Sequence, residues 1–328
     1  MPSTAGGFIT LTAAGNLSVD GSGATAGPNG VFTLTSQTGQ VLVTGALSGK
    51  SLFIDAMGQA PFTIGGANVG LNGIQGTVAF SDIVDIVNRN GNIDIADPTR
   101  LNAATLSLRT FGSSAITLAK GAVLSASSSI SLQTESSDIG KGKFYLDAPV
   151  LSLMSSGGAV DVVSFHNGDV DLIKAQAGDY FSLTASQGLS VINGARAEDG
   201  SVTLVAGGGT LQILDPVVAV NGRVAIQNTD TVNGSIQLSD TITTTSAGKG
   251  TGKEIIIAIG KLKKTNANNA PQMFITVVED RGRVRFGKQG VTPVGPATVS
   301  AIGRNVYFNN QGAGQIVIST GANIRAEK

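Results

Sequence analysis

Apolar residues in this chain recur at every second position in short bursts, and Gly, Asn or Pro interrupts each burst. Because side chains alternate between the two faces of a β-strand, each burst predicts a short strand with one apolar row turned inward. The stretch 201–238 shows this most clearly, with apolar pairs at Val202 and Leu204, Leu211 and Ile213, Val218 and Val220, Val224 and Ile226, Ile236 and Leu238. The residues between them are expected on the outer face: Thr203, Gln212, Ala219, Ala225 and Gln237.

The same sequence repeat, a Gly followed by alternating apolar residues, recurs along most of the chain. It begins at Gly168, Gly178 and Gly188, so that two repeats give a period of about 20 to 22 residues, which is typical of a solenoid. No window has a convincing helical period, and 45 Gly residues suit many tight corners. The pattern therefore predicts an all-β fold with very little helix, a parallel β-solenoid.

An antiparallel sandwich or barrel is the alternative, because Asn-Gly pairs such as Asn29-Gly30 and Asn233-Gly234 are typical of hairpin turns. The solenoid is preferred because regular repetition over most of the 328 residues exceeds what one sandwich needs. We expect residues 1–328 to form one continuous, elongated rod. The repeat is interrupted at residues 57–73 and 246–272, which are expected to be irregular loops or insertions that project from the rod.

Several repeats resemble a known family. The segments GSIQLSDTITTTSAGKGTGKEI, GAVLSASSSISLQT and GQIVISTGANIRA are similar in style to repeats of the filamentous haemagglutinin class of large secreted bacterial adhesins. The resemblance implies a right-handed parallel β-helix and a structural, adhesive, non-enzymatic role. Residues 27–31, GPNGV, depart from the family's Asn-Pro-Asn-Gly-Ile signature at the first and last positions, so the chain is interpreted as a shaft.

The same resemblance implies an extracellular or bacterial cell-surface location. The first residues, MPSTAGGFITLTAAGNL, lack the basic and long apolar regions of a secretory signal, and no run approaches the length of a membrane span. The expectation is therefore either a cytosolic protein or a piece of a larger exported one.

Composition narrows the chemistry. Cys and Trp are absent and His166 is the single His, which excludes thiol nucleophiles and Cys-based metal sites. Residues 248–253, GKGTGK, are rich in glycine but lack the spacing of a P-loop. The sequence also contains no Gly-Gly-x-Gly-x-Asp repeat of the kind that binds calcium. No cofactor and no obligatory metal are predicted.

Solenoids also carry polysaccharide lyases and glycoside hydrolases, which use outward carboxylates. Asp169 and Asp171 are two residues apart and predicted on one face, with Asp161 and His166 nearby, so these carboxylates are the candidate catalytic groups of this alternative. The competing interpretation is that they are solvated outer positions of a strand whose Val170 and Leu172 point inward.

Charge is balanced in sum and uneven along the chain. Residues 1–222 carry nine Lys and Arg against sixteen Asp and Glu, and residues 223–328 carry thirteen against six, so the balances are −7 and +7. We expect end-to-end stacking of copies into fibres, with an acidic end against a basic end and with Arg281, Arg283 and Arg285 as candidate assembly residues. A net charge of zero disfavours nucleic acid as a partner.

Aromatic residues are few and partly paired, as in Phe144-Tyr145 and Tyr180-Phe181. Alternation predicts that one ring of each pair is in the core and the other is exposed. An exposed ring is able to stack on a sugar, so a cell-surface glycan or receptor is a further candidate partner.

Overall fold

The computed structural model describes residues 7–20, 24–65, 72–230, 234–238, 240, 242–245, 255–259, 272–277, 283–286, 298–302, 305–310, 315–318 and 323–327. Within this part of the chain the elements are β-strands, apart from the short 3₁₀ helix η1 (Pro98–Arg100). The chain divides into two compact units, Met1–Gly158 and Ala159–Lys328.

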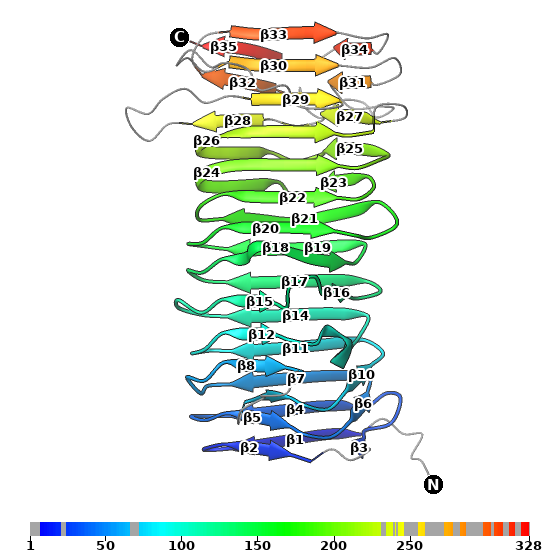
Figure 1. Cartoon of the computed structure of the whole chain (residues 1–328), viewed down its shortest axis with the longest axis vertical. Helices are drawn as coiled ribbons and strands as arrows, with labels where there is room; N and C mark the ends of the chain where they lie inside the picture. The colour runs from blue at the N-terminus through cyan, green and yellow to red at the C-terminus, as the bar shows by residue number, and fades with distance from the viewer. Residues whose placement is uncertain are drawn as a thin grey trace. The chain divides into compact units, whose positions relative to one another are not determined.

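In the first unit the strands of six residues stack coil on coil in one parallel ladder (Figure 1). Its members are β1 (Phe8–Ala13), β4 (Val31–Ser36), β7 (Ser51–Ala56), β11 (Ile83–Asn88), β14 (Thr105–Thr110), β17 (Ser129–Thr134) and β19 (Val150–Ser155). Register partners on neighbouring strands lie 20 to 24 residues apart in the sequence; Phe32 and Leu52, for example, are 20 apart. The exception is the step from β7 to β11, where Leu52 and Val84 lie 32 residues apart. The regular steps are close to the predicted period.

Two further sets of strands, short except for the nine-residue β18, complete the coils of this unit. The second set comprises β2 (Leu17–Val19), β5 (Val41–Val43), β9 (Gly73–Ile74), β8 (Phe62–Ile64), β12 (Ile93–Ile95), β15 (Ile116–Leu118) and the start of β18 (Ile139–Asp147). The third set comprises β3 (Ala24–Thr25), β6 (Leu47–Gly49), β10 (Val78–Phe80) and β13 (Leu101–Asn102), and β16 (Val123–Ser125) pairs with the end of β18.

The second unit also has three parallel ladders (Figure 1). The first runs through β20 (Val160–Ser164), β22 (Phe181–Ala185), the ends of β24 (Ala195–Ala206) and β26 (Val217–Asn228), β29 (Ile255–Ile259), β30 (Gln272–Val277) and β33 (Asn305–Asn310). The second runs through β21 (Val170–Ala177), β23 (Leu189–Val191), β25 (Thr210–Ile213), β27 (Ser235–Leu238), β31 (Arg283–Phe286) and β34 (Gln315–Ile318). The third joins the end of β21 and the starts of β24 and β26 to β28 (Ile242–Thr245), β32 (Thr298–Ile302) and β35 (Asn323–Glu327).

The prediction of an all-β parallel β-solenoid is confirmed, because the strand pairs of the described residues are parallel and join successive coils. The sandwich alternative is wrong, since it requires antiparallel hairpin partners. Asn-Gly pairs serve here as corners of the coil instead; Asn221, for example, adopts a φ of 58°.

An aliphatic core fills the coils of each unit. In β4, β14, β17 and β19 exposure alternates strictly, and the inward residues are almost fully buried, with Leu34, Leu108, Leu132 and Leu153 each at 0% exposure. The aromatic prediction holds at Tyr180-Phe181, where Phe181 is fully buried and Tyr180 is 39% exposed; in the other pair Phe144 is buried and Tyr145 is half-buried.

The predicted face assignments are wrong at two places in β26: Ala225, expected on the outer face, is only 2% exposed, and the phase of the first part of the strand is reversed. Val217 and Ala219 of β26 are buried, whereas Val218 and Val220, which were expected inside, are half-buried. Both Val217 and Val218 are apolar, so alternation alone permits two phases at this point. The ladder decides between them, because Val217 and Ala219 stack on the buried Ala195 and Ala197 of the preceding coil.

The predicted layout of one solenoid over 1–328 with two projecting loops stays a prediction. Within 57–73 the structure contains β8, which pairs with β12, and within 246–272 it describes β29, which pairs with β26, and the first residue of β30. The other residues of 246–272 lie outside the described residues, as do 66–71.

Candidate functional site

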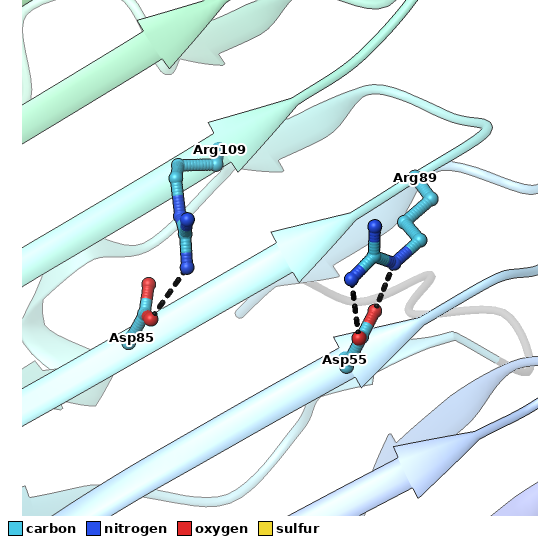
Figure 2. Close-up of polar contacts among 4 residues, drawn as sticks. All are labelled: Asp55, Asp85, Arg89 and Arg109. Carbon is cyan, nitrogen blue, oxygen red and sulfur yellow. Dashed lines mark hydrogen bonds and ion pairs between the residues drawn. The ribbon is translucent and has the colours of Figure 1, made fainter.

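Among the described residues of the first unit, ion pairs cross from coil to coil on the outer surface; two of them are drawn in Figure 2, and a looser one joins Lys50 to Asp82 at 3.9 Å. Asp55 on β7 accepts two hydrogen bonds of 2.8 Å, from Nε and Nη2 of Arg89, which directly follows β11. Asp85 on β11 accepts one hydrogen bond of 2.8 Å, from Nη2 of Arg109 on β14. Outward alternation places these carboxylates and the Arg109 guanidinium on the outer face. The register partners of Asp55 and Asp85 are Val87 and Ser107, so each acid lies diagonally across from an Arg two residues beyond its partner.

The first pair forms the stronger contact. The hydrogen bonds to Asp55, supported by its negative charge, raise the pKa of Arg89, and the guanidinium also lies 5.6 Å from the centre of the Phe111 ring. The two side chains are 43% and 29% exposed, so solvent screens much of the attraction. This pair acts as a modest clamp between two coils.

The second ion pair, between Asp85 and Arg109, contains two buried polar atoms without a hydrogen bond. Oδ1 of Asp85 and Nε of Arg109 are shielded from solvent and have no protein hydrogen-bond partner within the described residues. A bound ligand would have to reach these atoms through the side chains that cover them. Val87, the register partner of both Asp55 and Arg109, is only 6% exposed although it belongs to the outer row. The cluster therefore seals an apolar position between coils.

The carboxylates predicted from the sequence lie on two ladders. Asp161 is on β20 beside Ser182, whereas Asp171 is on β21 beside Ser190. Asp169 lies at the corner that precedes β21, where its Oδ1 accepts a hydrogen bond of 3.2 Å from the backbone N–H of Gly188 in the next coil. Val170 and Leu172 are fully buried, as the competing interpretation predicts.

His166 lies close to Asp169 in the sequence, and its backbone is built into the corner. Its N–H donates to Oγ of Ser164 at 3.3 Å, and its carbonyl accepts from Oγ of Ser186 at 2.6 Å. The structure thus gives the corner around Asp169 a role in joining coils.

Other charged groups also stabilise local structure. Asp97 caps η1, and its pKa is lowered first by the hydrogen bond from the Thr99 hydroxyl. The pKa of Glu198 is lowered first by its hydrogen bonds from the Arg196 guanidinium. A general acid of a glycoside hydrolase needs a raised pKa, so neither carboxylate suits that task.

Buried polar side chains end several strands of the first ladder of each unit, and sequence reasoning missed them. Asn228 is fully buried, donates to the carbonyls of Gly209 at 2.9 Å and Ser235 at 3.0 Å, and accepts from the N–H of Asp230 at 3.0 Å. In the first unit Ser36, Asn88, Thr110, Thr134 and Ser155 occupy the last inward positions of their strands. The sequence does carry a signal for these residues: a polar residue two positions after an inward apolar residue, just before a corner.

The described residues of the first unit line hollows, of which two are noted. One, of about 350 Å³, lies where the pairing of β15 with β18 is reduced to Ile116 and Ile139, and Asp138 and Lys143 contribute to its lining. The other, of about 410 Å³, is open and lined mainly by small residues of the third strand set. Within the described residues no group of three or more His, Asp or Glu side chains is placed to hold a metal ion.

The predicted assembly residues fall in the C-terminal part of the chain. Arg281 lies outside the described residues. The backbones of Arg283 and Arg285 are in β31, in register with Ser235 and Gln237 of β27 and with Gln315 and Val317 of β34.

Comparison with protein family models, with curated proteins and with solved structures finds no match for the chain. The part of the chain that the structure describes contains no helix with the length and apolar character that a membrane crossing requires.

Proposed function

We propose that the chain is a non-enzymatic, structural and adhesive β-solenoid, a shaft segment of an extracellular or surface fibre of the filamentous haemagglutinin type. The observation that carries the proposal is the use of outer polar groups to join coils. Asp55 bonds Arg89, Asp85 bonds Arg109, and Asp169 bonds the Gly188 N–H, each across a coil boundary.

The sequence supports the same proposal. Repeats similar to those of secreted adhesins recur in the chain, and 13% charged residues with many Ser, Thr and Asn suit a polar surface over an aliphatic core. Two aromatic residues on the second unit, Phe165 at 51% exposure and Tyr180 at 39%, are the candidate contacts for a cell-surface glycan. An extracellular or cell-surface location follows from the same resemblance and is part of the proposal.

An assay with anionic polysaccharides tests the proposal against a solenoid lyase or glycoside hydrolase. We expect no release of reducing ends or unsaturated products by the parent protein, and the same baseline for Asp169→Asn, Asp171→Asn and Asp161→Asn. The Asn side chain retains an oxygen able to accept the Gly188 N–H, so Asp169→Asn should keep the fold.

Turnover by the parent that Asp171→Asn loses while keeping the parent's circular dichroism would overturn the structural proposal. A variant that unfolds would lose turnover whether or not its Asp is catalytic. The thermal midpoint of each variant is therefore measured beside the assay, and only variants that keep the parent's midpoint are compared.

A further inference from the structure

The chain contains seven Asn-Gly pairs, and the structure describes both residues of six of them. In such a pair the backbone nitrogen of the glycine is able to attack Cγ of the asparagine and close a succinimide ring, because glycine has no side chain to hinder the approach. The attack requires an asparagine side chain that turns toward the backbone and a glycine N–H that is not held in a hydrogen bond. The local fold therefore decides which pair reacts.

Five of the six described pairs are protected. Asn72 is buried, and its side-chain amide accepts one hydrogen bond and donates another. In three further pairs the side-chain amide donates a hydrogen bond to the neighbouring coil, as seen at Asn90, Asn193 and Asn221. In the pair Asn29-Gly30 the N–H of Gly30 is itself engaged, because it donates to the Gly27 carbonyl at 3.0 Å.

The pair Asn167-Gly168 has neither protection. It lies in the corner between β20 and β21, and Asn167 is exposed. In the part of the chain that the structure describes, the Asn167 side chain and the Gly168 N–H form no hydrogen bond. The flanking His166 and Asp169 are anchored instead, since each accepts a hydrogen bond from the next coil. The corner is thus held at both ends, and its middle is open to reaction.

The single imidazole of the chain stands beside the same glycine. A β-carbon placed on Gly168 would lie 3.2 Å from Nε2 and 3.5 Å from Cδ2 of His166. The ring is therefore within reach of the Gly168 nitrogen, directly or through one water molecule, as proton transfer requires. A neutral imidazole accepts a proton at one of its ring nitrogens. His166 is thus placed to take the proton that the glycine nitrogen loses when it attacks.

We infer that Asn167 and Gly168 form a site of spontaneous deamidation, with His166 as the general base. The Gly168 nitrogen forms a bond to Cγ of Asn167 and passes its proton to the imidazole. The bond between Cγ and Nδ2 then breaks, and Nδ2 takes up that proton and leaves as ammonia. Water opens the succinimide at one of its two carbonyls, which gives aspartate or isoaspartate at position 167. The substrate is the chain itself, and water is the co-reactant.

The product alters the corner. Aspartate and isoaspartate both bring a carboxylate close to Asp169, whose own carboxylate accepts the Gly188 N–H. Isoaspartate also adds one carbon to the main chain between His166 and Asp169, which are both anchored to the next coil. Both changes oppose these anchors, so the deamidated protein is expected to unfold at a lower temperature than the parent.

Peptide mapping by mass spectrometry tests the inference on the full chain, kept folded in a warm, mildly alkaline buffer. We expect Asn167 to be converted several-fold faster than Asn193 and Asn221, and the difference to shrink in urea, where the fold protects none of them. His166→Gln should slow conversion at Asn167 several-fold in the folded protein and leave Asn193 unchanged. Gly168→Ala provides a second slow variant, because its methyl group hinders the attacking nitrogen.

Asn167→Gln is the matched control, because its longer side chain closes a ring far less readily. After incubation the thermal midpoint of the parent should fall, and that of Asn167→Gln should not. The thermal midpoints of the fresh variants are measured first, and only variants that keep the parent's midpoint are compared. Conversion at Asn193 or Asn221 that equals conversion at Asn167 in the folded protein would overturn the inference. An undiminished preference for Asn167 in urea, or parental rates in both His166→Gln and Gly168→Ala, would also overturn it.

Discussion

Ile226→Asp is expected to destabilise the fold by about 4 kcal/mol or more at neutral pH. Ile226 is fully buried, and its register partners Leu204 and Ile257 in the preceding and following coils are also fully buried. A carboxylate at this position would lose its hydration without gaining a partner. Since domains of ordinary size are stable by about 5 to 15 kcal/mol, the loss would remove much of the stability.

Gln227→Asp is the matched control, because Gln227 is the next residue of β26 and lies on the outer, half-buried row. We expect it to cost about 1 kcal/mol or less. Urea unfolding followed by circular dichroism measures both variants. Equal losses would show that the two residues do not occupy opposite faces, and the inward assignment of this strand would then be wrong.

Gly76→Ala is expected to destabilise the first unit by about 2 to 3 kcal/mol or more, because a β-carbon has no room there. It would lie 1.8 Å from the carbonyl oxygen of Gly45 and 2.4 Å from its carbonyl carbon. These are backbone atoms of the neighbouring coil, so relief requires the coils to separate and weakens the β6–β10 ladder that begins nearby.

Gly15→Ala provides the comparison, because a β-carbon at Gly15 meets no atom within 4 Å. It is expected to leave stability unchanged or slightly raised, since alanine restricts the unfolded chain more than glycine does. Thermal unfolding distinguishes the two variants. An equal midpoint for both would mean that the coils are not packed as closely at Gly76 as the structure has them.

The strand-and-corner architecture could be predicted because side-chain alternation is local. Val202 and Leu204, or Ile236 and Leu238, identify the inward row of their strands without knowledge of any neighbour. The prediction failed at Val217 to Val220, where adjacent apolar residues permit two phases and the preceding coil makes the choice.

The outer ion pairs could not be predicted because they depend on register between coils. Asp55 and Arg89 are 34 residues apart, and the long coil between β7 and β11 departs from the average period. The catalytic candidates illustrate the same limit. Asp161 and Asp171 are close in sequence, yet they lie on strands of different ladders, and sequence proximity does not reveal this.

The central claim is that successive coils stack in parallel register. Pairs of introduced cysteines test it most directly, because the chain has no Cys of its own. Ser182 and Thr203 are outer register partners on β22 and β24, and partners on adjacent strands lie about 4.8 Å apart, within the range of a disulfide. Val205, two residues further along β24, is paired with Thr184 and lies beyond the reach of about 7 Å from Ser182. The account predicts that Ser182→Cys with Thr203→Cys oxidises to an intramolecular disulfide in the folded protein, while Ser182→Cys with Val205→Cys stays reduced. Equal oxidation of both pairs, or oxidation of the offset pair alone, would contradict it.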